Sequence, residues 1–176
     1  MKFTETALQG AYLVAPERIE DERGFFARTF CRREFETHHL NFNLVQCSVS
    51  FNRQRGTLRG MHYQSAPHAE TKLVRCIRGA IYDVILDVRS QSPTFGRWIS
   101  TVLSADNGLM LYVPEGVAHG FQTLELESEI FYQISEFYAP EHGRGIRWND
   151  PAFAIEWPIV NPILSMRDRM HPAFVR

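Results

Sequence analysis

The sequence is poor in cysteine, in long apolar runs and in excess charge of either sign. Its three cysteines form no Cys-x-x-Cys pair and cannot all pair with one another, so reduced thiols are the simplest account. A formal net charge of -1 gives no general attraction for nucleic acid or an anionic membrane. No apolar run has the length of a transmembrane helix, and the first residues lack the apolar core of a signal peptide. We therefore expect a cytoplasmic protein without a nucleic-acid or membrane partner.

Long helices are missing too. Only residues 31–39 favour a helix, a short one anchored in the core by Phe35. From Leu44 onward the pattern is of β-type, and it contains eight strand candidates, at 45–51, 57–64, 73–78, 81–88, 98–103, 110–113, 120–123 and 130–137. Many short strands at this spacing are typical of an all-β sandwich or barrel. The absence of long helices between them argues against a parallel α/β sheet.

The ends of the chain are less regular. Residues 1–15 are expected to be extended, with a strand at 11–15, and residues 21–26 to form a turn that leads into an aromatic strand. The tail from Pro140 is expected to be ordered by packing on the barrel rather than by regular structure. At 176 residues the chain suits one domain. We divide it into N-terminal strands and a short helix (1–45), a barrel core (46–138) and the tail (139–176).

One stretch, residues 56–64 (GTLRGMHYQ), carries a histidine and an arginine between glycines. Strict alternation would place His62 on one face of a strand and Arg59 on the other. Taken alone, the stretch is typical of a half-buried strand with a packed histidine. Three other features favour a functional site: Lys72, residues 114–120 (PEGVAHG) and Asp168 near the C-terminus.

The spacing of glycine and histidine resembles that of the cupin jelly roll. Residues 108–119 carry the glycine, proline, glycine and histidine of the second cupin signature. In the first signature Gly56 and His62 fit, but Gln64 replaces the second histidine and the acid, Glu70, is displaced. A cupin metal site needs convergent histidine and carboxylate ligands, and glutamine is a poor substitute for imidazole. We therefore predict a cupin barrel that uses no metal, with a metal-bound cupin as the alternative.

Without a metal, His62 requires another role. A neutral imidazole can act as a general base near neutral pH, and a carboxylate on its other nitrogen would orient it. Asp168 is a candidate for that carboxylate, and Asp83, Asp87 and Asp150 remain open.

Lys72 and Tyr132 offer further groups for a proton-transfer site. A lysine supplies a fixed positive charge for an oxyanion, and a tyrosine supplies a phenolic proton donor. Each residue also has an ordinary interpretation: Lys72 as a surface charge, Tyr132 as a core aromatic residue and Asp168 as a turn residue. Their joint occurrence favours a site.

Motifs that run in order along nearly the whole chain resemble those of the dTDP-4-dehydrorhamnose 3,5-epimerase family, the sugar-nucleotide epimerases of the cupin superfamily. The matching stretches are residues 21–26, 56–64, 72–75, 92–96, 114–121, 148–151 and 165–168. The resemblance implies an isomerase of deoxysugar and cell-surface polysaccharide biosynthesis, which inverts C3 and C5 of a nucleoside-diphospho-4-keto-6-deoxysugar through an enolate. It also implies a homodimer that exchanges N-terminal strands, and a reaction without a metal or organic cofactor.

The same resemblance implies residue roles by matching position. His62 would abstract the proton with support from Asp168, Lys72 would stabilise the enolate oxygen, and Tyr132 would return a proton from the opposite face. The implied substrate-binding residues are Arg23 and Arg59 at the diphosphate, Gln46 and His119 at the sugar, and Phe26 and Tyr138 at the nucleotide base. Part of this binding surface would come from a neighbouring subunit.

Three positions depart from the family pattern. An acidic residue is common at the position of Arg28, near the pyrimidine, and an arginine cannot accept hydrogen bonds from a base, so the nucleotide is open. Residues 46–48 read Gln-Cys-Ser in place of the usual Gln-Asp-Asn, and Arg167 replaces a common lysine. The alternatives are an epimerase of a single centre, acting on a GDP- or CDP-linked sugar, a metal-dependent cupin enzyme, and a sugar-binding cupin without activity.

Overall fold

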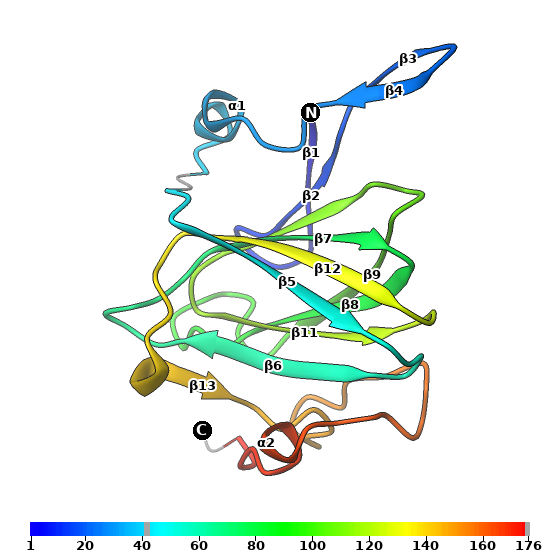
Figure 1. Ribbon diagram of the computed structural model, residues 1–176. Helices are drawn as coiled ribbons and strands as arrows, with labels where there is room; N and C mark the ends of the chain where they lie inside the picture. Colours follow the sequence, from blue (N-terminus) through cyan, green and yellow to red (C-terminus); the bar gives the residue numbers. More distant parts are fainter. Residues whose placement is uncertain (41–42, 175–176) are drawn as a thin grey trace.

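Two antiparallel β-sheets face each other in the computed structural model, which describes residues 1–40 and 43–174 (Figure 1). The strand order is β1-β2-β10-β7-β12-β5 in the six-stranded sheet and β13-β6-β11-β8-β9 in the five-stranded sheet. A separate hairpin, β3–β4, stands outside both sheets. This architecture confirms the predicted all-β jelly roll with a few short helices.

The elements are short and follow one another closely. The strands of the two sheets are β1 (Lys2–Glu5), β2 (Tyr12–Ala15), β5 (Gln46–Asn52), β6 (Leu58–Gln64), β7 (Lys72–Arg78), β8 (Ala80–Asp87), β9 (Trp98–Ser104), β10 (Met110–Val113), β11 (Val117–Thr123), β12 (Ser128–Ile134) and β13 (Gly143–Gly145). The hairpin consists of β3 (Arg18–Asp21) and β4 (Gly24–Ala27). The helical segments are α1 (Arg32–Thr37), the 3-10 turn η1 (Pro140–His142) and α2 (Met166–Arg169).

The eight predicted strands are all present, with ends shifted by at most three residues, and the helix expected at 31–39 is α1. The sequence pattern does not predict β1, β3, β13 or α2. These are segments of three or four residues, too short to show a period of their own. Residues 41–42 and 175–176, which fall in the predicted first and last sections, lie outside the described residues. No helix in the described part of the chain is long and apolar enough to cross a membrane.

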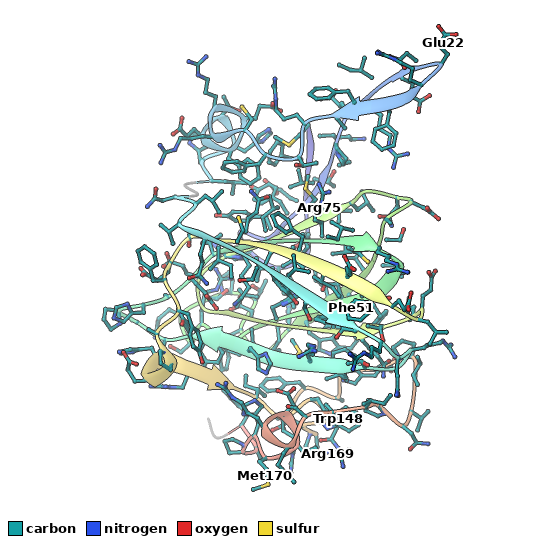
Figure 2. All side chains as sticks on the ribbon, in the orientation of Figure 1. Glu22, Phe51, Arg75, Trp148, Arg169 and Met170 are labelled. Carbon is teal, nitrogen blue, oxygen red and sulfur yellow. The ribbon has the colours of Figure 1, made fainter. Side chains whose placement is uncertain are left out.

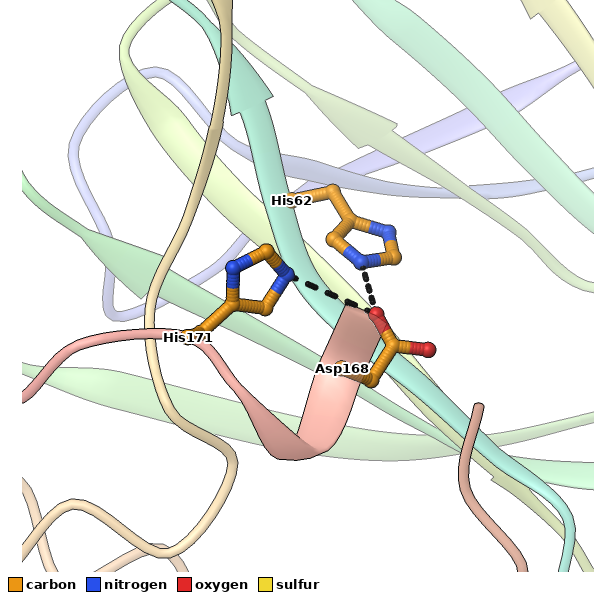
Figure 3. A group of neighbouring side chains, drawn as sticks. All are labelled: His62, Asp168 and His171. Atoms are coloured by element: carbon orange, nitrogen blue, oxygen red, sulfur yellow. Dashed lines mark hydrogen bonds and ion pairs between the residues drawn. The ribbon is translucent and has the colours of Figure 1, made fainter. Parts of the chain in front are cut away.

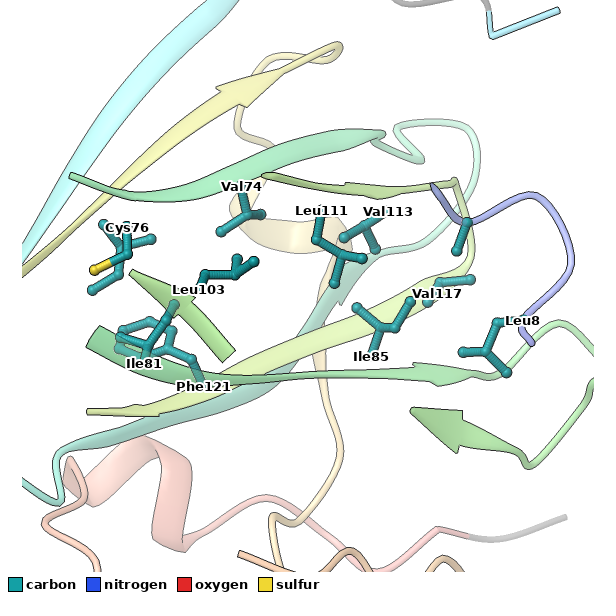
Figure 4. Packing of buried hydrophobic residues seen from close by; sticks show 12 residues of the cluster. Leu8, Val74, Cys76, Ile81, Ile85, Leu103, Leu111, Val113, Val117 and Phe121 are labelled. Atoms are coloured by element: carbon teal, nitrogen blue, oxygen red, sulfur yellow. The ribbon is translucent and has the colours of Figure 1, made fainter. Parts of the chain in front are cut away.

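Apolar side chains fill the space between the two sheets (Figure 4). Val74 of β7 and Leu111 of β10 meet Ile85 of β8 and Phe121 of β11 there, and all four side chains are fully buried. Burying a side chain of this size contributes about 1.5–3 kcal/mol. This layer therefore holds the two sheets together around the base of the cavity described below.

The C-terminal tail covers the outer face of the five-stranded sheet. Ile146 and Phe153 pack there against Val84 and Leu86 of β8, and Trp98 Nε1 donates a hydrogen bond to the carbonyl of Phe153 at 2.9 Å. Side chains cover both faces of this sheet. Nearly every residue of β8 and β11 is therefore buried, and buried residues do not alternate with exposed ones. The tail also contains β13 and α2, so it is not ordered by packing alone.

Strand β6 departs from strict alternation. His62 pairs with His119 of β11 and Arg59 pairs with Phe121, so three residue steps along β6 span two steps along β11. The extra residue lies at a close approach of the two strands, where a Cβ on Gly60 would come within 2.5 Å of the Gly120 Cα. This bulge shifts the side-chain alternation. Arg59 and His62 therefore line the same cavity, and the prediction that they face opposite sides of the strand is wrong.

The β3–β4 hairpin projects from the body of the molecule, with Glu22 at its tip (Figures 1 and 2). Ile19, Phe25 and Phe26 are exposed on it. Large apolar side chains that are exposed together on one element are typical of interaction surfaces.

Candidate active site

A cavity of about 310 Å³ opens into the jelly roll beside the edge strand β5. Both sheets and α2 supply its walls: Ser48, Val49, Ser50, Arg59, His62, Lys72, His119, Phe121, Tyr132, Ile134 and Asp168. All four residues predicted to be catalytic lie in this lining, although 106 residues separate His62 from Asp168. The fold therefore gathers them at one site.

The pair of His62 and Asp168 is held by a short hydrogen bond. His62 Nε2 lies 2.5 Å from Asp168 Oδ1 (Figure 3). Asp168 sits in the first turn of α2, where Ser165 caps the helix by accepting from the Asp168 amide at 3.1 Å and donates its own hydroxyl to Asp168 Oδ2 at 2.9 Å. Burial alone would raise the pKa of Asp168, but the contacts with His62 and Ser165 lower it below its usual range. The carboxylate is therefore charged and fixed.

The other carboxylates that the sequence left open as partners of His62 have partners of their own. Asp83 binds His119, and Asp150 accepts from the backbone amides of Ala152 and Phe174.

Asp87 closes the turn after β8. Its carboxylate accepts hydrogen bonds from Arg89, Ser92 and Thr94, which lower its pKa to about 2 against the effect of burial. The family-like stretch at residues 92–96 is thus part of a structural turn, outside the cavity lining.

Sequence reasoning missed His171. Its Nε2 lies 3.5 Å from the same Oδ1 of Asp168 that His62 contacts, and the two imidazole rings are 5.5 Å apart in an edge-on arrangement (Figure 3). A Cβ on Gly145 of β13 would lie 2.0 Å from the His171 ring, so only glycine leaves room for this ring. Burial, followed by the nearby His62, lowers the pKa of His171. The only signal in the sequence is its position three residues after Asp168, which places it next to Asp168 on a helical turn.

Tyr132 faces the cavity from β12 beside a second histidine–carboxylate pair. The rings of Tyr132 and His119 are 6.0 Å apart, edge to face. His119 Nε2 lies 2.8 Å from Oδ1 of Asp83, a fully buried residue. Burial, together with the charge of Asp83, raises the pKa of Tyr132. The phenol is therefore protonated at neutral pH and can act only as a proton donor in its resting state.

Two cationic side chains reach the cavity. Lys72 at the start of β7 is buried and lies 2.5 Å from the carboxylate of Glu70. Arg59 Nε donates to Asn52 Oδ1 of β5 at 2.8 Å. A site with one lysine and one arginine favours a negatively charged ligand or intermediate.

Two residues of the damaged cupin signature, Gln64 and Glu70, have partners of their own. Gln64 is buried, and its amide donates to the carbonyls of His68 and Phe137 and accepts from the backbone amide of Ala139. Glu70 is paired with Lys72. Neither side chain is available to join His62 in a cupin ligand set.

Four of the predicted substrate-binding residues lie outside this cavity lining. Arg23 and Phe26 are on the projecting hairpin, where Arg23 pairs with Asp21 at 2.6 Å. Gln46 of β5 accepts a hydrogen bond from the Tyr138 amide at 3.2 Å. Tyr138 lines a neighbouring cavity of about 120 Å³ that shares His62 with the first. Within one chain, therefore, Arg59 and His119 lie in the larger cavity and the other four do not.

Comparisons with known proteins agree with this architecture. The sequence model of the dTDP-4-dehydrorhamnose 3,5-epimerase family matches residues 5–176. A protein of that name from Sinorhizobium fredii is 42% identical over 174 residues, which cover 98% of this chain and 89% of the relative. The crystal structure of the enzyme of that name from Bacillus anthracis, with TDP and PPi bound, has a TM-score of 0.96 at 44% identity, covering 98% of this chain and 99% of the other.

A second solved structure is the dTDP-6-deoxy-D-glucose-3,5-epimerase of Legionella pneumophila in complex with dTDP-4-keto-L-rhamnose. It has a TM-score of 0.92 at 34% identity, and the match covers 98% of this chain and 92% of the other. The fold and these likenesses define a cupin-type sugar-nucleotide epimerase. The chain belongs to the dTDP-4-dehydrorhamnose 3,5-epimerase family.

Proposed function

We propose that this protein is an epimerase that inverts C3 and C5 of a dTDP-linked 4-keto-6-deoxysugar, in deoxysugar and cell-surface polysaccharide biosynthesis. Family membership supports the reaction class. The observation that carries the proposal is that one cavity is lined by the His62–Asp168 pair, by Lys72 and by Tyr132, whose pKa is raised.

His62 is the general base in this mechanism. The C4 ketone acidifies the hydrogens on C3 and C5, because the resulting carbanion is delocalised as an enolate. With Nε2–H of His62 bound to Asp168, Nδ1 carries the lone pair that takes the proton. The charged carboxylate then stabilises the imidazolium that forms.

Lys72 and Tyr132 complete the inversion. The ammonium group of Lys72 stabilises the enolate oxygen. Tyr132 donates its proton to the carbon from the face opposite His62, which reverses the configuration, and the phenolate recovers a proton from solvent. His62 releases its proton to solvent, so the net reaction consumes none. The same residues serve C3 and C5, provided that the sugar ring turns between the two steps.

Substrate binding requires a second copy of the chain in this proposal. Arg59 binds the diphosphate, Gln46 and His119 bind the sugar, and Tyr138 contacts the nucleotide base. We propose that Arg23 and Phe26 reach the site from the hairpin of a partner protomer in a homodimer. The exposed apolar residues of the β3–β4 hairpin, and the free edge of β5 with its exposed Val49 next to the cavity, support this exchange.

Mixed dimers test the exchange. Each cavity would combine His62 of one protomer with the hairpin of its partner. Co-expressing His62→Ala chains with Arg23→Ala chains should therefore restore one intact site per heterodimer, although both parent variants are inactive. Absence of recovery in an isolated heterodimer would contradict the exchange and would leave the chemistry at His62 untouched.

Deuterium uptake tests the proposed reaction. The enzyme is incubated in deuterium oxide with dTDP-, GDP- and CDP-linked 4-keto-6-deoxysugars, and label at each carbon is read by NMR. We expect label at C3 and C5 of the dTDP sugar. Label at one carbon only would identify an epimerase of a single centre, a GDP or CDP preference would correct the nucleotide, and no label would leave a sugar-binding protein without this activity.

Three further expectations belong to this proposal. We expect the chain to act as one epimerase domain. We expect cytoplasmic localisation, which three free thiols support. We also expect the reaction to need no metal or organic cofactor, so activity should survive exhaustive treatment with a chelator.

A further inference from the structure

Three potential metal-ligand atoms converge at the rim of the cavity, and the proposed reaction uses only two of the residues that carry them. His62 Nε2, Asp168 Oδ1 and His171 Nε2 all lie within 4.8 Å of one another. Among residues 1–40 and 43–174, no other group of three histidine, cysteine or acidic side chains meets this criterion. His171 contributes nothing to the proposed proton transfers, so its presence needs another explanation.

The nitrogen of His171 is buried without a hydrogen-bond partner. His171 Nε2 has almost no contact with solvent and makes no hydrogen bond to any described residue. Asp168 Oδ1 lies 3.5 Å from it, beyond the range of a good hydrogen bond. A buried polar atom without a partner is unfavourable, because it has lost its hydrogen bonds to water. The ring is nevertheless held in this orientation by its close fit over Gly145.

We propose that His62, Asp168 and His171 form an inhibitory binding site for a divalent transition metal ion, with Zn²⁺ as the best chemical match. Two neutral imidazoles and one carboxylate are a ligand set that zinc favours, and three protein ligands leave a fourth position for water. The ion reaches the site through the cavity, because the His62 side chain is 42% exposed.

The geometry requires a local adjustment of the ligand side chains. Ligand atoms around a tetrahedral zinc ion with bonds of 2.0–2.2 Å lie about 3.3–3.5 Å apart. The His171–Asp168 separation of 3.5 Å already fits. The His62–Asp168 separation of 2.5 Å must open by roughly 1 Å. The ion takes the place of the proton on Nε2 of His62, and the neutral ring adopts the tautomer with its proton on Nδ1, so this ring releases no net proton.

Inhibition follows from the tautomer that the metal imposes, and this step rests on the proposed function. A neutral imidazole has one N–H and one lone pair. When Nε2 of His62 binds the ion, the ring proton resides on Nδ1. Nδ1 then has no lone pair with which to abstract a proton from the sugar, and Asp168 no longer supports the base.

The first measurement is zinc binding alone. Chelator-treated protein is titrated with zinc chloride by isothermal titration calorimetry, without substrate. We expect one ion per chain in the wild type, and binding weaker by about tenfold or more in His171→Phe and His171→Gln. Phenylalanine keeps a ring on Gly145 and glutamine keeps a polar side chain, so either variant can serve if the other fails to fold.

His142→Phe is the matched control. His142 packs against His68, with the two rings tilted and 4.7 Å apart, outside the proposed metal site, so we expect this variant to bind zinc like the wild type. The proposal is overturned if the wild type shows no saturable zinc binding, or if the His171 variants bind as tightly as the wild type.

The second measurement is deuterium uptake in the presence of zinc chloride, relative to the zinc-free rate of each variant. We expect wild-type uptake to be suppressed and to recover with a chelator, and the His171 variants to need about ten times more zinc. Equal sensitivity of the variants would contradict the proposal. Zinc binding that depends on His171 in a protein without any uptake would support the metal site and reject the proposed function. Deuterium uptake in a protein that does not bind zinc would support the proposed function and reject the metal site.

Discussion

The two histidine–carboxylate pairs at the cavity differ in their position in the fold and in their exposure to solvent. Asp83 and His119 both lie on central strands of the five-stranded sheet, with side chains 0% and 5% exposed. Asp168 comes from the tail and meets a His62 side chain that is 42% exposed. Burial raises the pKa of Asp83, whose Oδ2 has no hydrogen-bond partner among the described residues. Hydrogen bonds lower the pKa of Asp168.

This difference indicates which pair can exchange protons. His62 is partly exposed, so it can release a proton to solvent after each turnover, and hydrogen bonds lower the pKa of its carboxylate. His119 is enclosed, and burial raises the pKa of its carboxylate. We therefore assign proton transfer to the rim pair and sugar binding to the enclosed pair.

The largest effect should come from His62→Ala. Removing the single base should reduce deuterium uptake at both carbons to the background rate, a loss of about 10⁴-fold. NMR detection of label at C3 and C5 measures it. Uptake that persists at one carbon would mean that a second base serves that centre, and His119→Ala would identify it.

Exchanging the two acids for amides should separate the pairs most sharply. Asp168→Asn removes the charge that orients and supports the base, and should lower the rate by about 10²-fold or more. Asp83→Asn should lose less than about tenfold, because that acid moves no proton in the mechanism. If both variants are folded and lose kcat to a similar extent, the proposal that only the His62–Asp168 pair transfers protons is wrong.

Replacing Tyr132 with Phe should affect the rate of inversion and the rate of deuterium uptake to different extents. The enolate can still form, but proton return from the opposite face is lost, so inversion should slow by about tenfold more than deuterium uptake. Both rates come from one NMR time course. Equal losses would count against Tyr132 as the returning acid.

The smallest effect concerns the stability that Asp87 contributes. This residue lies on β8, the same strand as Asp83. The pKa of Asp87 is lowered to about 2, from an ordinary value near 3.9. The folded form therefore favours the charged carboxylate, which contributes about 2.6 kcal/mol of stability at pH values above the unfolded pKa. This contribution is lost as the pH falls toward 2. Asp87→Asn should lower the free energy of unfolding by about this amount at pH 7 and by less at pH 3, measured by urea denaturation. A larger destabilisation at pH 3 than at pH 7 would contradict the link between the lowered pKa of Asp87 and stability.

The sequence predicted more of the barrel than of its ends. Strands such as β7 and β10 carry a local apolar pattern that reflects their burial, so their positions could be predicted within about a residue. β13 has only three residues and becomes a strand because it pairs with β6. The bulge at Gly60 was equally invisible, because it depends on the approach of Gly120 from another strand.

The candidate site also contains residues that could be predicted from the sequence and residues that could not. By resemblance to its family, the sequence assigned chemical roles to His62, Lys72, Tyr132 and Asp168, because each role depends on a side-chain type at a recognisable motif. It could not choose Asp168 over the other aspartates from pattern alone. It also gave no reason to single out His171.

The amino-acid sequence by itself determined the fold class, the family and the kinds of acid and base that the chain carries, since these follow from local composition and motif order. Only the tertiary structure decided which carboxylate meets which histidine, and that Arg59 and His62 share a cavity. Hydrogen bonds and burial depend on separations of a few ångströms between residues that are distant along the chain, and no local pattern encodes those distances.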